Sequence, residues 1–310
     1  MENRKLGWTG FPVSVLGLGT VELGLKYGIA AEAPPAREEA IAVLRYAVER
    51  GITYIDTARS YGTAEELIGE SGISSKQGII VGTKCGAFYE QGEDPRGAEL
   101  TRRLEEEISA SLRALRRDTL DFLHVHGASA EVIERGELLE ELRRLKEQGK
   151  VRYFGAAARG EEGALAAVAS KFFQAVQVAV SILDQRMRDR VLARTFAEGY
   201  GVIARSVFLK GVLTPRRGFL PKELDALRAR AEAIEDYVTR EGLTLREAAI
   251  RFVLSIPEVS TLLIGTTKKK HIDEAVASVE RGALPAPIMG ELSAFRLDDE
   301  RLVDPQYWKL

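Results

Sequence analysis

Short apolar segments alternate with longer amphipathic segments along most of the chain, and this alternation restricts the fold more than any other feature of the sequence. The apolar segments are four to seven residues long, a length typical of strands buried in a parallel sheet. Eight of them are predicted as strands, namely 15–19, 53–56, 78–83, 120–126, 151–155, 175–179, 201–205 and 261–265.

The segments between these strands carry apolar residues at the spacing of a helix face. Three of them are predicted as helices, at 37–50, 100–115 and 138–148. The apolar stripe of the first is formed by Ala40, Ile41, Leu44 and Val48. Gly51 follows that segment, at a position where glycine commonly ends a helix. About eight repeats of strand and helix favour an α/β fold of the (β/α)8 TIM barrel type over an open sheet, which more often stops at about six strands.

Two terminal segments fall outside this repeat. Residues 4–16 are predicted as a β-hairpin that turns at Thr9 and Gly10 and caps the floor of the barrel. The tail 284–310 contains three prolines and shows little periodicity, so it is predicted to pack as an ordered loop. Because no linker or shift in composition separates these segments, residues 1–310 are predicted to form a single domain.

Composition narrows the class of protein. The 44 Lys and Arg residues are balanced by 46 Asp and Glu residues, so the basic excess typical of nucleic-acid binders is missing. No apolar run reaches the roughly 18 residues that a membrane span needs, and the first residues lack an apolar signal core, which favours a cytoplasmic location. The single cysteine, Cys85, excludes an internal disulfide and a thiolate metal cluster. We therefore expect a small-molecule partner, and the oligomeric state stays open.

Ionisable side chains follow three consecutive strands of the predicted barrel. Asp56 and Tyr61 follow the second strand, Lys84 ends the third, and His126 ends the fourth. Barrel enzymes carry their active sites at these strand ends. A phenol has a pKa of about 10, and we expect Lys84, held by Asp56, to lower the pKa of Tyr61 so that it exchanges protons at neutral pH. With His126 orienting a carbonyl by a hydrogen bond, these residues suit proton delivery to a carbonyl that receives hydride.

Other roles compete with the catalytic one. Asp56 and Lys84 also fit a structural ion pair. His124 and His126 share one face of a strand, as zinc ligands can, but the only other histidine is His271, and zinc sites use at least three protein ligands. We therefore expect no metal, and we expect His124 to be a core residue bonded to a neighbour.

Three stretches of the chain resemble the aldo-keto reductase family. The opening stretch 4–20 is similar to the start of that family, and Asp-Thr-Ala-Arg-Ser-Tyr-Gly at 56–62 is similar to its tyrosine signature. Ile-Gly-Thr-Thr at 264–267 resembles its late cofactor-binding motif. The resemblance runs from about residue 4 to about residue 282.

The resemblance implies roles for the candidate residues. Tyr61 is implied as the general acid/base, tuned by Lys84 and Asp56, and His126 as the group that orients the carbonyl. The implied cofactor is NADP(H), with NAD(H) as the alternative, extended across the barrel mouth without a Rossmann domain. The residues expected to bind it are Gly19, Thr20, Gln177, Arg205, Ser206, Lys210, Gly265, Thr266, Thr267, Lys268, His271 and Glu274.

The chain departs from the family pattern around the nicotinamide. After the fifth strand the family commonly has Ser-Asn to hold the carboxamide, whereas Ala157 and Ala158 have no polar side chains. Gln177 matches a third carboxamide contact. An aromatic residue that often stacks on the ring is replaced by Arg205, whose guanidinium plane can also stack. Near the adenine, Ala275 replaces an Asn.

Three consecutive lysines at 268–270 begin the predicted last helix, with Thr267 as its N-cap. A run of charge is usually a solvated surface. At a helix N-terminus, however, each cation is unfavourable by roughly 0.3–1 kcal/mol, and the loops after strands seven and eight commonly bind phosphate in this fold. We therefore expect Thr266, Thr267 and some of the lysines to receive the 2′-phosphate of NADPH.

Two functions agree with the sequence. The first is an NADP(H)-dependent oxidoreductase that interconverts a carbonyl and an alcohol by hydride transfer. The second is a non-catalytic nicotinamide-binding redox sensor or regulatory subunit of the same fold, which the changes at Ala157, Ala158 and Arg205 favour and the intact catalytic residues oppose. Sugars, sugar derivatives and simple aldehydes all stay open as substrates. Four aromatic residues lie in segments that either wall the pocket or pack against loops: Tyr27, Phe88, Tyr89 and Trp308.

Overall fold

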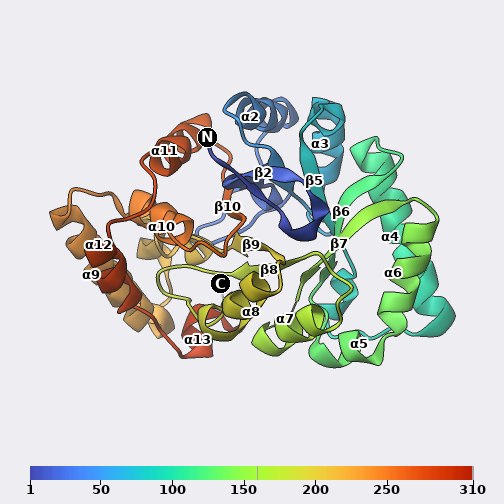
Figure 1. The fold of residues 1–310 in the computed structure, drawn as a ribbon. Coiled ribbons are helices and arrows are strands. Elements are labelled where there is room, and N and C mark those ends of the chain that lie inside the picture. Colours follow the sequence, from blue (N-terminus) through green and yellow to red (C-terminus); the bar gives the residue numbers. More distant parts are fainter. Residues whose placement is uncertain (159, 309–310) are drawn as a thin grey trace.

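The computed structural model describes residues 1–158 and 160–308, and its centre is a closed barrel of eight parallel strands (Figure 1). The strands follow one another around the barrel in chain order, and β10 pairs with β3 to close it. They are β3 (Leu16–Gly19), β4 (Tyr54–Asp56), β5 (Ile80–Cys85), β6 (Leu120–His126), β7 (Val151–Ala157), β8 (Ala175–Ala179), β9 (Gly201–Arg205) and β10 (Thr261–Gly265). The predicted barrel is confirmed, because each predicted strand overlaps an observed one.

The strands are buried on both faces, which explains why they appear in the sequence as unbroken apolar segments. All residues of β4 and β5 are buried, and β6 is buried up to its last residue, His126. In β9 and β10 the exposed positions are the last ones, Arg205 and Gly265. The C-terminal strand ends are therefore where the barrel meets solvent and where polar side chains are available.

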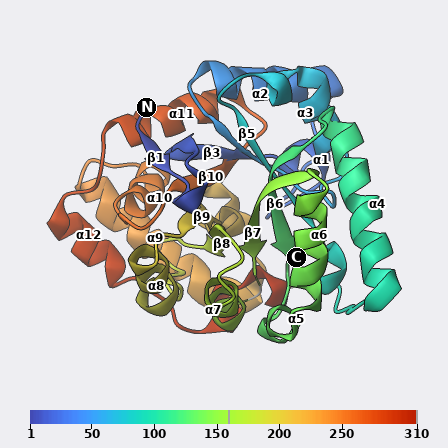
Figure 2. The same cartoon turned by 45° about the vertical axis from the view of Figure 1, so that its right-hand side comes forward.

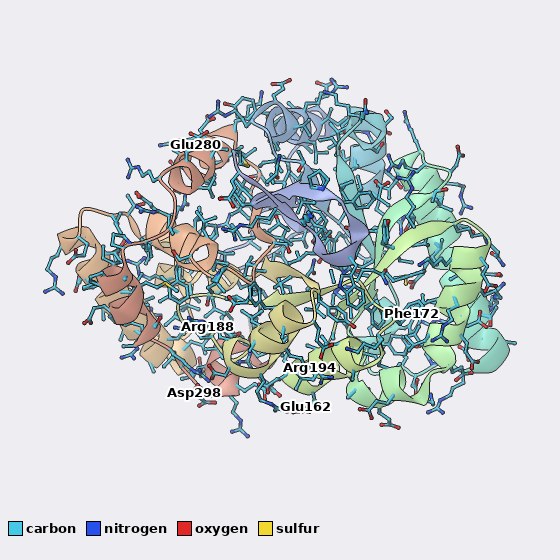
Figure 3. All side chains as sticks on the ribbon, viewed as in Figure 1. Glu162, Phe172, Arg188, Arg194, Glu280 and Asp298 are labelled. Atoms are coloured by element: carbon cyan, nitrogen blue, oxygen red, sulfur yellow. The ribbon has the colours of Figure 1, made fainter. Side chains whose placement is uncertain are left out.

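Helices surround the barrel (Figures 1 and 2). They are α1 (Val21–Gly24), α2 (Arg37–Glu49), α3 (Ala64–Ser71), α4 (Gly97–Leu115), α5 (Ala130–Arg135), α6 (Glu137–Glu147), α7 (Gly160–Ala169), α8 (Ala193–Ala197), α9 (Asp225–Arg240), α10 (Leu245–Leu254), α11 (Lys269–Glu280), α12 (Ala286–Ser293) and α13 (Glu300–Val303). Charged side chains such as Glu162 on α7 and Glu280 on α11 stand on the outer surface (Figure 3). Within the described part of the chain, no helix combines the length and the apolar character of a membrane span.

The three predicted helices are confirmed as α2, α4 and α6, but the buried face of α2 differs from the predicted stripe. Ala40 and Leu44 are buried as predicted, whereas Ile41 and Val48 are only partly buried. Val43 and Ala47 take their place in the contact with the barrel, because the packing direction, and not apolar character alone, selects the row of residues that turns inward.

The N-terminal hairpin is confirmed. It consists of β1 (Asn3–Lys5), a 3-10 turn η1 (Gly7–Thr9) and β2 (Pro12–Ser14). The turn ends at Gly10, which has a left-handed φ of 74°. Leu6 and Val13 of the hairpin form one apolar cluster with Tyr54 and with other residues inside the barrel, among them Ile80 and Ala175 at the starts of β5 and β8. The hairpin therefore closes the barrel floor, opposite the C-terminal strand ends.

The prediction of a loop for the tail is wrong, because the tail contains α12, α13 and a final 3-10 turn η8 (Pro305–Tyr307). The prolines that suggested a loop lie at helix starts, where a missing N–H breaks no intrahelical bond. Leu292 of α12 is buried, and the backbone N–H of Leu297 donates to Leu183 at 2.9 Å. These contacts attach the tail to the barrel.

Candidate active site

A cavity of about 1330 Å³ opens at the C-terminal strand ends. Its wall includes Asp56, Tyr61 and His126, and Lys84 is buried next to Asp56. All the residues predicted to bind a cofactor also line it: Gly19, Thr20, Gln177, Arg205, Ser206, Lys210, Gly265, Thr266, Thr267, Lys268, His271 and Glu274. The closed barrel therefore brings the two predicted groups together in one space.

Asp56 and Lys84 form a buried ion pair between adjacent strands. The register of β4 on β5 pairs Asp56 with Gly82, so Lys84 lies two residues further toward the cavity. Its ammonium donates to both carboxylate oxygens of Asp56, at 2.8 and 2.7 Å, and to the carbonyl of Thr57 at 2.8 Å. Burial lowers the pKa of Lys84, and the Asp56 carboxylate opposes that shift. With all three N–H donors used, the pair meets the condition for keeping charges out of water.

Two residues predicted at the cofactor also hold Asp56. The side-chain amide of Gln177 donates to Oδ1 of Asp56 at 2.7 Å, across 121 positions of sequence. The hydroxyl of Thr20 donates to the backbone carbonyl of Asp56 at 2.9 Å. Because these bonds join β8 and the end of β3 to β4, the position of Asp56 depends on the closed barrel and not only on its own loop.

Tyr61 lies in the loop between β4 and α3. Its backbone N–H donates to Ala58 and its carbonyl accepts from Ala64, both at 3.1 Å, so the loop forms consecutive tight turns. Gly24, at the end of α1, permits this placement because a Cβ atom there would collide with the carbonyl oxygen of Tyr61. The Lys84 ammonium lies 4.8 Å from the centre of the Tyr61 ring, and the rings of Tyr61 and His126 are 6.3 Å apart.

The surroundings of Tyr61 raise its pKa. Burial is the main cause, the Asp56 and Glu90 carboxylates add to it, and Arg205 opposes it. The sequence-based expectation that Lys84 would lower this pKa is therefore wrong for this structure. The reason is that Lys84 directs its donors to Asp56 and Thr57, which compensates its charge. Tyr61 is thus protonated at neutral pH.

The two histidines of β6 have different environments. His124 is buried with Nε2 3.0 Å from the Tyr54 hydroxyl, and burial, with Lys84 and His126 nearby, holds its pKa well below the usual value. The prediction of a core histidine bonded to a neighbour is confirmed. His126 reaches the cavity, and its Nε2 lies 3.1 Å from Oε1 of Glu90. Across residues 1–158 and 160–308, no three His, Cys, Asp or Glu side chains form a group suited to a metal ion.

The cavity wall at β7 and β9 is less polar and less constrained by hydrogen bonds. Ala157 and Ala158 present methyl groups to the cavity. Arg205 is exposed at the end of β9, and its guanidinium donates to the Ser206 hydroxyl at 3.3 Å. Three non-glycine residues of the following loop have left-handed φ angles: Ser206 (61°), Leu209 (45°) and Lys210 (55°). Such strain concentrates at functional sites, where surrounding structure must maintain it.

The lysine cluster is arranged differently from the prediction. Helix α11 begins at Lys269, and Lys268 is its N-cap. The prediction that Thr267 is the N-cap of this helix is therefore wrong. Instead Thr266 closes the turn, because its hydroxyl accepts from the Lys268 N–H at 3.0 Å and contacts Nδ1 of His271 at 2.9 Å. Nor is α11 the last helix, since α12 and α13 follow it. Lys269 lies 5.2 Å from the Tyr46 ring, outside the cavity lining that includes Lys268.

The cavity wall contains charged residues that the sequence analysis missed. Glu22 pairs with Arg216 at 2.9 Å, and Arg246 pairs with Glu274 at 3.1 Å. Glu90, bonded to His126, is a fourth such residue, since Glu274 was among the predicted ones. These residues come from segments that meet only above the barrel, so no local motif marks them.

Only one of the four candidate wall aromatics lies at the cavity within the described residues. Tyr27 lines the cavity and is 41% exposed, with the Lys210 ammonium 5.4 Å from its ring. Phe88, Tyr89 and Trp308 are buried in the hydrophobic core, so they pack against loops and helices.

Comparison with known proteins agrees with this geometry. The model of the Aldo/keto reductase family matches residues 15–296. The chain is 29% identical, over an alignment 320 positions long, to L-galactose dehydrogenase of Arabidopsis thaliana, covering 97% of this chain and 92% of that protein. It is 26% identical over 294 residues to the uncharacterized oxidoreductase YqkF of Bacillus subtilis, covering 89% of this chain and 90% of that protein. The holo form of aldo-keto reductase AKR11C1 from Bacillus halodurans shares the fold, with a TM-score of 0.79 and 24% identity. The match covers 97% of this chain and 99% of that one.

Proposed function

This chain belongs to the aldo/keto reductase family, and we propose that it transfers hydride between NADP(H) and the carbon of a carbonyl or alcohol, with Tyr61 as the general acid/base. The observation that carries this proposal is the arrangement at one end of the cavity. There the Lys84 ammonium of the Asp56–Lys84 pair lies over the Tyr61 ring, and the His126 ring lies edge-on to it, 6.3 Å away. An oxidoreductase of this family needs a proton donor at the carbonyl oxygen, and this arrangement supplies one.

Each residue of this arrangement has a distinct task. Tyr61 holds the proton that the carbonyl oxygen receives, and its raised pKa keeps that proton in place at neutral pH. Lys84, 4.8 Å from the ring centre, holds the Asp56 carboxylate in a fixed ion pair beside the ring. His126 donates a hydrogen bond to the same oxygen through Nε2 and so fixes the orientation of the carbonyl.

The cavity fits a dinucleotide together with a small substrate. Its volume exceeds the roughly 300–1,000 Å³ of ordinary small-ligand pockets. Gly19 and Gly265 are paired in adjacent strands and leave that part of the wall without side chains. Away from Tyr61, Lys268, His271 and Arg246 offer donors for a phosphate. When the cofactor is bound there, it supplies or accepts the hydride.

The preference for NADP(H) over NAD(H) rests on the start of α11. Lys268 lines the cavity beside His271, and its ammonium is a suitable partner for the 2′-phosphate of NADP(H). Burial lowers the pKa of His271, so this residue is neutral and acts as a hydrogen-bond donor. Of the lysines expected to bind phosphate, Lys268 is therefore the one we propose.

The substrate is proposed to be a small polar carbonyl compound or the corresponding alcohol. Charged groups from Glu22, Glu90 and Arg205 face the cavity near its catalytic end, which suits a substrate with several hydroxyls. The name of the plant relative, L-galactose dehydrogenase, makes sugars the first class to test.

A second function is favoured by one observation. The methyl groups of Ala157 and Ala158 offer no hydrogen bond at the wall where the family commonly holds the carboxamide. A nicotinamide-binding sensor without turnover needs a bound cofactor but no precise ring position, and this wall agrees with such a role.

Two measurements on the purified protein test these functions. In a fluorescence titration we expect tight binding of NADPH and weaker binding of NADH, whereas equal affinities would remove the proposed NADP preference. We also expect NADPH consumption with aldehydes or NADP⁺ reduction with sugars. Binding without turnover across neutral, acidic and basic pH would favour the sensor, and failure to bind either cofactor would overturn both functions.

A further inference from the structure

Glu90 places a carboxylate at the catalytic end of the cavity. It directly follows the 3-10 turn η3 (Ala87–Tyr89), and its Oε1 lies 3.1 Å from Nε2 of His126. The fold is adapted to this contact at Gly127, the residue after β6, which has a left-handed φ of 73°. A Cβ atom at position 127 would collide with Cγ of Glu90. The approach of Glu90 to His126 is therefore a built contact between two loops.

The protonation states at this contact follow from its surroundings. Burial opposes ionisation of Glu90, but the hydrogen bond with His126 and the charges of His126, Arg205 and Lys84 outweigh it, so the pKa of Glu90 is lowered. Glu90 is ionised at neutral pH and can only accept hydrogen bonds. His126 must then carry a proton on Nε2 and donate it to Glu90.

This bond uses the same proton that His126 is proposed to offer to the substrate. When a carbonyl oxygen takes the Nε2–H of His126, Glu90 loses its hydrogen-bond partner from the described part of the chain. The side chain of Glu90 is 53% exposed before substrate enters, and a substrate would cover it. A charged acceptor left without a donor in a covered site is unfavourable. The transfer of the His126 hydrogen bond from Glu90 to the carbonyl oxygen is favourable only if the substrate carries a hydrogen-bond donor close to its carbonyl, which then bonds to Glu90.

We propose that Glu90 is a specificity-determining residue that accepts a hydrogen bond from a substrate hydroxyl on the carbon next to the carbonyl. This inference rests on the proposed function and narrows its substrate to α-hydroxycarbonyl compounds and, in the reverse direction, vicinal diols. The substrate hydroxyl replaces His126 as the donor to Glu90, while His126 turns its N–H to the carbonyl oxygen. Substrates with a carboxylate on that carbon are repelled by Glu90.

The test compares two aldehydes that differ by one hydroxyl, 2-hydroxypropanal and propanal. Values of kcat/KM with NADPH and with NADH are measured against the free aldehyde concentration, because both compounds hydrate in water. For the unmodified protein we expect a clear preference for 2-hydroxypropanal. Glu90→Leu is expected to lower the ratio of the two kcat/KM values by about tenfold or more, and Glu90→Gln, which keeps an acceptor without the charge, by a smaller factor.

The control is Glu93→Gln in the same loop, where Glu93 pairs with Arg103 away from the cavity. It is expected to leave the ratio unchanged. A purely structural effect of Glu90 would reduce both kcat/KM values equally, and an unchanged ratio in Glu90→Leu overturns the inference. Equal use of the two aldehydes by the unmodified protein also overturns it while leaving the proposed function intact. Turnover of neither aldehyde, nor of any sugar or diol, overturns the proposed function and the inference with it.

Discussion

The two walls of the cavity differ in how they are held. On the wall formed by β4, β5 and β6, the charges of Asp56 and Lys84 are buried and bonded to each other, and Gln177 and Thr57 complete the set. On the wall formed by β7 and β9, Arg205 is exposed and the alanines present only methyl groups. The charged pair beside Tyr61 is thus held by several buried hydrogen bonds, whereas the Arg205 side chain on the second wall makes one long bond, to Ser206.

The backbone shows the same difference. The catalytic wall takes its geometry from strand register, since Asp56 pairs with Gly82 and Lys84 with His124. The other wall continues into the loop in which Ser206 and Lys210 have left-handed φ angles. Regular pairing positions side chains without strain, whereas a strained loop depends on its contacts. Substitutions on the first wall should therefore affect chemistry and stability, and those on the second should affect affinity.

The largest effect is expected for Tyr61→Phe. Removing the hydroxyl removes the proton donor, so kcat should fall by about 10²–10⁴-fold. The dissociation constant of NADPH should stay within about twofold, because the ring that packs at the cavity is kept. Steady-state kinetics and fluorescence titration measure the two quantities. Turnover close to that of the unmodified protein would rule out Tyr61 as the acid/base.

Lys84→Met tests whether the catalytic wall also stabilises the fold. It leaves the Asp56 carboxylate buried without its cation, and we expect the free energy of unfolding to fall by about 3–5 kcal/mol. Lys84→Met combined with Asp56→Asn should regain most of this stability, because the unpaired Asp56 carboxylate charge is removed. It should regain no activity, because the Lys84 ammonium is still missing. Chemical denaturation measures both. A double variant no more stable than the single one would contradict the argument.

The raised pKa of Tyr61 predicts different pH responses for the two directions of the reaction. Reduction uses the phenol, which stays protonated, so its kcat/KM should be flat from about pH 6 to 9. Oxidation uses the phenolate, whose fraction rises with pH below the raised pKa, so its kcat/KM should increase by about tenfold per pH unit. Initial rates in both directions give the profiles. A reduction rate that falls above pH 7 would mean that the pKa is lowered after all.

On the cofactor side, Lys268→Ala is expected to weaken NADPH binding by about tenfold and to leave NADH binding unchanged. The reason is that Lys268 lines the cavity at the start of α11. Lys269→Ala is the matched control, because Lys269 lies at the Tyr46 ring and should change neither affinity. Equal losses for both lysine variants would assign the effect to the net charge of the helix start.

The smallest effect is expected for Arg205→Gln. If the nicotinamide lies at the end of β9, the Arg205 cation disfavours the positively charged oxidised ring relative to the neutral reduced one. The variant should therefore lower the ratio of the dissociation constant of NADP⁺ to that of NADPH. The expected decrease is only about two- to fivefold, because exposed charges interact weakly. Arg216→Gln, whose side chain pairs with Glu22, is the control. An unchanged ratio in Arg205→Gln would place the ring elsewhere.

The sequence alone determined the barrel and the order of its catalytic residues. Eight buried strands leave unbroken apolar segments, and ionisable residues stand at the C-terminal ends of three of them. Asp56 and His126 are the last residues of β4 and β6, and Lys84 lies one residue before the end of β5. In a closed parallel barrel these ends must meet, so their proximity follows from chain order.

Only the tertiary structure decided which of these residues bond to one another and how they are charged. The bonds from Gln177 to Asp56 and from His126 to Glu90 join segments that have no common local pattern. The pKa of Tyr61 rises because burial and the Asp56 carboxylate outweigh the opposing charge of Arg205. Periodicity along a chain reports which residues are buried, but hydrogen bonds and electrostatic fields depend on distances in space, and those are set only when the barrel closes.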